Sequence, residues 1–179
     1  PKKEQVKKET APAVDFSAIE PKENEATEYL KSILVGMGFT DVAVTAREAE
    51  EDVYFEITCG EDYGNIIGRR GETLDALQYI TSLVANHVEN SYFKITVNTG
   101  NYREKRENTL EILGRKLAFK AVKTGKKTAL EPMNPYERRI IHTSVQKVKG
   151  AISWSEGENA NRHVVIGPDP KSRHNRYNN

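Results

Sequence analysis

The sequence has few of the residues that build covalent cross-links, metal sites or membrane spans. Cys59 is the only cysteine among 179 residues, which excludes an intrachain disulfide and a cysteine-based metal cage. We expect Cys59 to be a small buried apolar residue in a strand. The four histidines lack the spacing of metal ligands: His87, His142, His163 and His174. No apolar run is long enough to span a bilayer, and no secretory signal pattern is present.

Motifs that carry enzyme chemistry are also absent. The sequence contains neither the phosphate-binding loop of nucleotide hydrolases nor a His-Glu-x-x-His metal motif. A nuclease would need clustered carboxylates to hold metal ions, whereas the carboxylates here crowd into residues 21–62, mostly in helix and turn positions. We therefore predict that the protein is not an enzyme and uses no metal or cofactor.

Charge is segregated along the chain, although the formal net charge is only +1. Residues 21–62 hold 3 Lys/Arg and 11 Asp/Glu, whereas residues 63–179 hold 20 and 11. A basic half indicates an acidic partner such as nucleic acid, and the acidic part would keep nucleic acid from the wrong surface. The alternative interpretation is a solvated surface of mixed charge.

The first half of the sequence alternates between helical and strand-like periodicity. The expected elements are a helix from Glu23 to Gly36, strands at 42–46 and 53–59 joined by a charged turn at 47–52, a short helix before Gly68, a longer helix at about 71–87, and a strand at 92–99. The predicted order is therefore αββααβ, closed at about residue 99.

A glycine-rich turn lies between the last two helices of this unit, where the sequence reads IIGRRGETLDAL from Ile66. Gly68 and Gly71 carry no Cβ, so the backbone can approach a ligand closely. Arg69 and Arg70 supply fork-shaped donors suited to phosphate, and the following helix directs its positive N-terminal end toward the same turn. The alternative is an ordinary linker with two solvated arginines.

The αββααβ order with Ile-Ile-Gly-x-x-Gly in this position resembles a type II KH domain. Such domains clamp the backbone of about four nucleotides with the GXXG loop. The resemblance implies that Gly68 and Gly71 permit close approach, while Arg69 and Arg70 contact phosphates. Ile67 and Leu74 would line the adjoining base groove, although a core role for either is an equal alternative.

The second half predicts a small α/β domain. We expect a helix at 101–123 with an apolar stripe and a basic remaining surface, a short strand at 128–131, a helix capped by Asn134 and Pro135, and strands at 151–155 and 162–166. The stripe consists of Leu110, Leu113, Leu117 and Ala121. The basic surface of this helix is either solvated or extends a phosphate-binding track. We expect Trp154 to anchor the core, and base stacking is the less favoured role.

Arg138 and His142 lie one turn apart on the second helix of this half, where a shared phosphate or a mutual hydrogen bond is feasible. In its strand–helix–strand–strand context this pair resembles the small single-stranded-nucleic-acid-binding domain named for the Arg-x-x-x-His motif. The alternative is a plain solvated helix face.

The two domains in this order resemble the bacterial Jag family, also called SpoIIIJ-associated proteins, over about residues 23–167. The segment GRRGETLDALQYITSLVANH is especially similar. The resemblance implies a cytoplasmic RNA-binding protein linked to cell elongation and division, with a small partner KH protein. Residues 1–20 resemble the end of a charged linker, and we expect the chain to be a piece of a longer protein.

The predicted organisation is α+β, with a flexible linker at 1–20, a type II KH domain at 21–99, an Arg-x-x-x-His domain at 100–167 and a flexible tail at 168–179. The predicted function is non-catalytic binding of single-stranded RNA, and also of single-stranded DNA, through the site residues Gly68, Arg69, Arg70, Gly71, Arg138 and His142. The alternatives are a protein-interaction scaffold and, less favoured, an RNA-processing enzyme. Assembly into a homo-oligomer is left open by the sequence.

Overall fold

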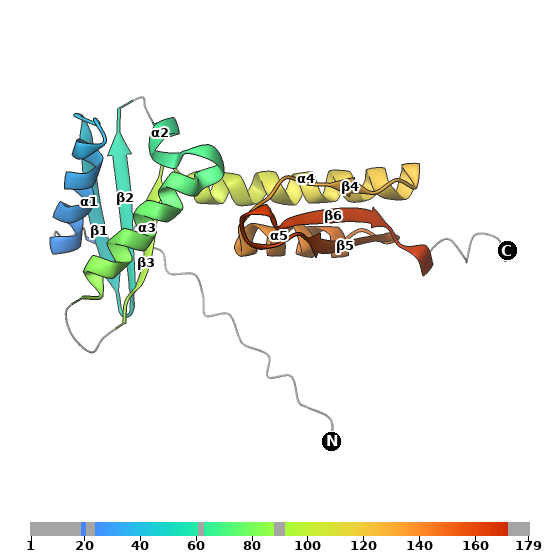
Figure 1. Ribbon diagram of the computed structural model, residues 1–179. Coiled ribbons are helices and arrows are strands. Elements are labelled where there is room, and N and C mark those ends of the chain that lie inside the picture. The colour runs from blue at the N-terminus through green and yellow to red at the C-terminus, as the bar shows by residue number, and fades with distance from the viewer. Residues whose placement is uncertain (1–18, 21–23, 61–62, 88–91, 172–179) are drawn as a thin grey trace, which may run out of the picture. The chain divides into compact units, whose positions relative to one another are not determined.

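A computed structural model describes residues 19–20, 24–60, 63–87 and 92–171 of the chain. These residues fall into two compact units, which divide between Gly100 and Asn101. Each unit combines helices with one three-stranded sheet, which confirms the predicted α+β class (Figure 1). Most of the predicted linker at 1–20 and most of the predicted tail at 168–179 lie outside the described residues.

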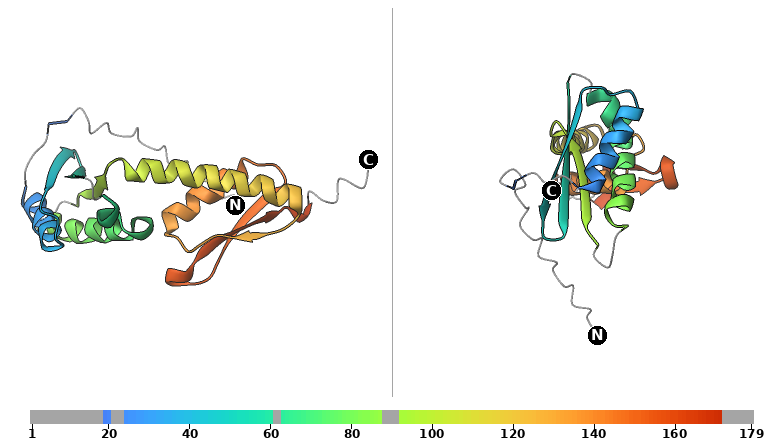
Figure 2. Two further views of the ribbon diagram at one scale, coloured as in Figure 1. Left: turned by 90° about the horizontal axis from the view of Figure 1, so that it is seen from above. Right: turned by 90° about the vertical axis from the view of Figure 1, so that its left-hand side faces the viewer.

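The first unit has the predicted αββααβ order. Its elements are α1 (Glu25–Gly36), β1 (Val42–Ala49), β2 (Asp52–Cys59), α2 (Tyr63–Ile67), α3 (Glu72–Ala85) and β3 (Lys94–Thr99). The strands lie in the order β1-β2-β3, with β1 antiparallel and β3 parallel to β2. Helices α1 and α3 cover one face of this sheet (Figure 2).

The core of the first unit follows from its sequence periodicity. Asn24 begins α1 with a capping box, in which its side chain accepts from the backbone N–H of Thr27 at 2.9 Å. The apolar stripe of α1 then packs on the alternating apolar residues of the central strand β2. Seven side chains are fully buried in this core: Leu30, Leu34, Phe55, Ile57, Ile66, Leu74 and Val97.

Two local predictions for this unit were wrong. The expected turn at 47–52 is shorter, because β1 and β2 stay paired up to Ala49 and Asp52 and leave only Glu50 and Glu51 as the connection. Charged residues suit the end of β1 because it is an edge strand whose last residues are only half-buried. Cys59 is half-buried rather than buried, since it is the last residue of β2.

The second unit packs two helices on one face of an antiparallel sheet. Its elements are α4 (Tyr102–Thr124), β4 (Thr128–Ala129), α5 (Pro135–Gln146), β5 (Ala151–Glu156) and β6 (His163–Pro168), and the strand order is β4-β6-β5. Asn134 and Pro135 begin α5 as predicted, and the Asn134 side chain accepts from the N–H of Glu137 at 2.9 Å. Figure 2 shows both helices on the same side of the strands.

Small residues bring α4 and α5 close together. Gly114 is buried, and a Cβ built on it would overlap the Ser144 side chain of α5. Periodicity alone placed Leu113 and Leu117 in the apolar stripe, but both are only half-buried, while Gly114 and Ala118 face the core. The sequence pattern overlooks such positions because small residues carry little hydrophobic signal.

An ion pair also joins α4 to the first turn of α5. The carboxylate of Glu137 is almost fully buried, and Arg106 Nε donates to it at 2.7 Å. A buried carboxylate needs such a partner, so the pair fixes how the two helices meet.

Trp154 is not the core anchor that we predicted. Its indole is only partly buried, and Nε1 donates to the Glu156 carboxylate at 2.6 Å. The ring edge lies close to Gly167 of β6, where an added Cβ would come within 3.2 Å. Because side chains alternate along a strand, Trp154 points away from the face on which Ser153 and Ser155 approach α5.

Candidate nucleic-acid interface

The Gly-Arg-Arg-Gly turn joins α2 to α3 through a short 3-10 turn at Arg69–Gly71. Gly68 has φ 71 and ψ −174, a conformation that essentially only glycine adopts. Arg70 has φ 57 and Gly71 has φ 83, so both lie in the left-handed region. Three of the four turn residues thus have positive φ, and the backbone turns sharply while leaving its surface clear of Cβ atoms at both glycines.

Gly68 is also required by space. A Cβ built on it would overlap the side chain of Thr73 and would lie 3.0 Å from the Thr73 backbone nitrogen. The turn is anchored at both ends, since the N–H of Gly68 donates to Gly64 at 2.8 Å and the N–H of Gly71 donates to Gly68 at 3.4 Å. The turn is therefore a defined structure and not a loose linker.

The cations of the turn stand at the N-terminus of α3. Arg69 is exposed and Arg70 is half-buried. Within the described structure no side chain caps α3, whose N-cap residue is Gly71. The positive end of the helix dipole therefore adds to the two guanidinium charges, which is the arrangement that favours an anion such as phosphate.

The two candidates for the wall of a base groove separate in the structure. Leu74 is fully buried and belongs to the core, together with Ile66. Ile67 is half-buried beside the turn. Of the two residues proposed from the sequence, only Ile67 retains surface with which to contact a base.

Arg138 and His142 lie on α5, but each bonds to other groups. Arg138 Nη1 donates to the carbonyl oxygen of Met133 at 2.8 Å. The two ring nitrogens of His142 face β5, where Nδ1 lies 2.8 Å from Ser153 Oγ and Nε2 lies 3.0 Å from Ser155 Oγ. The mutual hydrogen bond considered from the sequence is thus not seen, although the two side chains remain neighbours one turn apart.

These contacts keep His142 uncharged. Burial lowers the pKa of His142 below its ordinary value of 6.5, and the nearby positive charge of Arg138 lowers it further. A neutral imidazole donates through one nitrogen and accepts through the other, so one serine hydroxyl accepts from the ring and keeps its own hydrogen for another acceptor. The positive charge at this site therefore comes from Arg138, and His142 orients the serine hydroxyls.

The lowered pKa of His142 predicts a pH-dependent stability of the second unit. As pH falls below 6.5, unfolded His142 gains a proton that the folded state does not yet bind, so the free energy of unfolding decreases. The fluorescence of Trp154, the only tryptophan and a residue of the second unit, reports this unfolding in denaturant titrations at a series of pH values.

His142→Gln should remove the pH-dependent component, whereas His163→Gln, on β6 of the same unit, should retain it. A pKa of His142 above 6.5 in an NMR titration would contradict the arrangement described here.

Sequence reasoning missed Ser153 and Ser155. Their signal was present, because Ser-Trp-Ser on a predicted strand places both hydroxyls on one face. What the sequence lacked was the partner of that face, since the approach of α5 to β5 is a tertiary contact. The same holds for Thr73, whose side chain fills the space beside Gly68.

Two searches of the described residues found no other kind of site. No helix among them has the length and apolar character needed to cross a membrane. No group of three or more His, Cys, Asp or Glu side chains among them is arranged to hold a metal ion.

Comparison with known proteins assigns both units. Residues 23–97 match the KH domain of KhpA/KhpB, and residues 108–168 match the domain family named for the Arg-x-x-x-His motif. The RNA-binding protein KhpB of Clostridium symbiosum is 41% identical over 152 residues, which cover 84% of this chain and 68% of that protein. Its counterpart of the same name in Bacillus subtilis (strain 168) is 41% identical over 145 residues, covering 79% and 68%. The one in Streptococcus pneumoniae serotype 2 is 33% identical over 144 residues, covering 71% and 43%.

Proposed function

Because this chain belongs to the KhpB, or Jag, family and carries a KH domain followed by an Arg-x-x-x-His domain, we propose that it binds single-stranded RNA and catalyses no reaction. Its relatives in three bacteria are named RNA-binding proteins, which supports RNA as the ligand. RNA binding is the coarse part of the proposal, and the residues that grip the strand are its finer part.

The observation that carries the finer part is the backbone of the turn at 68–71. Gly68 and Gly71 present main chain without Cβ atoms, while Arg69 and Arg70 stand beside the uncapped N-terminus of α3. These groups together bind a phosphate through charge, helix dipole and close approach. We propose that this turn clamps the RNA backbone and that bases lie along Ile67.

Arg138 forms the second proposed contact. Its guanidinium uses one N–H on Met133 and retains other donors for a phosphate, while a hydroxyl of Ser153 or Ser155 is oriented by His142. Linking two weak sites on one chain raises the affinity for a strand that reaches both, because the second contact forms at high effective concentration. Single-stranded DNA presents the same phosphates, and we propose it as an additional ligand.

The alternative function is a protein-interaction scaffold with little direct RNA contact. Exposed apolar residues on the helical face of the first unit favour this alternative: Tyr29, Val35, Met37, Tyr79 and Leu83. The partner KH protein and the role in cell elongation and division that the Jag resemblance implies are compatible with either function. Cross-linking in cells separates the two, since recovery of protein partners without RNA favours the scaffold.

The proposal predicts binding that is steeply sensitive to salt. An end-labelled oligouridylate should bind the intact chain with an affinity that falls by about 0.7 log unit per phosphate contact for each tenfold rise in salt. Fluorescence anisotropy at several salt concentrations measures this slope. Duplex DNA, which cannot splay its bases along the turn, provides the comparison. An affinity for oligouridylate that ignores salt would argue against a phosphate-dominated site.

A further inference from the structure

The second half of α4 has an unusual charge composition. From Ile112 to Leu130 the chain carries six lysines and arginines and no carboxylate. The acidic residues of α4 all precede this stretch, the last of them being Glu111. Helix α4 therefore changes from mixed charge to uniformly positive charge along its length.

The positive residues surround two exposed apolar side chains. Ile112 and Phe119 are 64% and 60% exposed, and at about 100° per residue they lie within about 20° of each other around the helix. They are opposite the side that packs on the core, where Leu110, Gly114 and Ala118 are buried. We call the residues on this side the outward face of α4: Ile112, Lys116, Phe119, Lys120 and Lys123.

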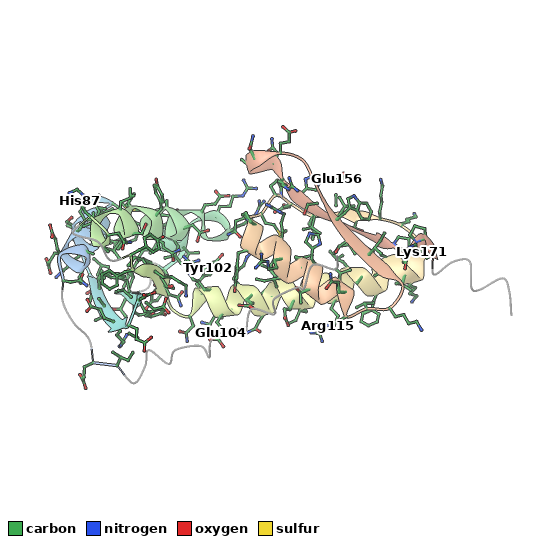
Figure 3. The ribbon with its side chains drawn as sticks, turned by 90° about the horizontal axis from the view of Figure 1, so that it is seen from below. His87, Tyr102, Glu104, Arg115, Glu156 and Lys171 are labelled. Carbon is green, nitrogen blue, oxygen red and sulfur yellow. The ribbon has the colours of Figure 1, made fainter. Side chains whose placement is uncertain are left out.

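The lysines of the outward face are available to a ligand. Lys116, Lys120 and Lys123 are exposed, and no carboxylate of the described residues lies within salt-bridge distance of them. Arg115, labelled in Figure 3, differs because it lies 3.9 Å from Glu111. Glu111 also lies 3.5 Å from Lys147 of α5, so this acid is already shared by two cations and leaves the three lysines uncompensated.

We propose that the outward face of α4 is a further RNA-binding surface, in which the three lysines hold phosphates and Phe119 contacts a base or ribose. This inference rests on the proposed function and adds a third contact to it. The surface is distinct from the Arg138 site, because His142 faces β5 whereas the outward face lies on the side of α4 away from its core.

Charge and side-chain type favour RNA over two other occupants. A helix that binds a lipid surface needs a broad apolar face, but the apolar stripe of α4 is used by the core. A helix that docks in a protein groove presents apolar anchors at successive turns, whereas lysines separate Ile112 from Phe119. A basic track with an exposed aromatic ring is the pattern of a surface for single-stranded nucleic acid.

The test compares two variants of the intact chain with the same change in net charge. Lys116→Gln/Lys120→Gln/Lys123→Gln removes the three lysines from the outward face, and glutamine keeps the helix propensity of lysine. Lys31→Gln/Lys94→Gln/Lys147→Gln is the matched control. Two of its three lysines already pair with acids, Lys94 with Asp52 and Lys147 with Glu111.

Affinity for oligouridylate should fall about 100-fold at about 0.1 M salt in the first variant, and its salt slope should become shallower by about 2, because each lost phosphate contact contributes about 0.7. The control should retain most of the affinity. A wild type that binds RNA and a first variant that matches the control would overturn this inference and leave the proposed function standing. A wild type that binds no RNA would overturn both.

Vesicles containing phosphatidylglycerol provide the third arm of the experiment. If wild type binds them, the first variant does not, and the affinities of the two for oligouridylate are equal, the outward face binds lipid and the RNA inference is wrong. Failure of the vesicles to bind, with RNA affinity lost in the first variant, supports RNA as the occupant.

Discussion

Arg69→Asp/Arg70→Asp is expected to lower the affinity for single-stranded RNA by roughly 600-fold at about 0.1 M salt, since two contacts are lost and two repulsive charges replace them, each step counting about 0.7 log unit. Aspartate is the appropriate reversal because it tolerates the left-handed conformation that Arg70 adopts at φ 57. Fluorescence anisotropy with end-labelled oligouridylate measures the loss.

Lys31→Asp/Lys171→Asp is the matched control for this variant. It makes the same change in net charge with two exposed cations, of which one lies on α1 and the other follows β6. If the loss came only from the overall field of the protein, both variants would bind equally weakly. Equal binding by wild type and the arginine variant, with circular dichroism unchanged, would show that the turn does not hold RNA.

Gly68→Ala is expected to destabilise the first unit by about 3 kcal/mol, because alanine at φ 71 and ψ −174 is strained and its Cβ overlaps Thr73. Such a cost is a large fraction of the stability of an ordinary domain. Turn geometry is lost with it, so RNA affinity should fall even where the unit stays folded. Amide hydrogen exchange at β2 measures the stability of this unit.

Gly64→Ala gives the control four residues earlier. Gly64 lies within α2, and a Cβ built on it meets nothing within 4 Å. Alanine there should be neutral or stabilising by up to about 1 kcal/mol, because it favours the helix more than glycine does. If both variants lowered exchange protection equally, the cause would be loss of glycine flexibility in general, and the special conformation at Gly68 would not matter.

The element order could be predicted from the sequence because its signals are local. Periodicity marks α3, and Asn134 followed by Pro135 marks the start of α5. The position of the glycine turn also followed, since it depends only on which helices flank Gly68 and Gly71. The left-handed conformation of Arg70 did not follow, because a non-glycine residue adopts it only where the surrounding structure compensates its cost.

The parts that sequence reasoning missed are contacts between distant elements. His142 was predicted as a site residue, but its two bonds to β5 depend on how α5 lies over the sheet. The outward direction of Trp154 depends on which face of β5 the helices cover, and alternation alone leaves that choice open. Gly114 was missed because its role is to leave room for Ser144 of the next helix.

The parallel pairing of β2 with β3 has a consequence for how this protein can vary. Parallel neighbours cannot be joined by a tight hairpin, so the chain must cross over between Cys59 and Lys94, and α2, the glycine turn and α3 form that crossover. Insertions or deletions in this segment would disturb the closure of the sheet as well as the turn. The two-residue hairpin at Glu50 and Glu51 carries no such double constraint, so changes in chain length should be tolerated there first.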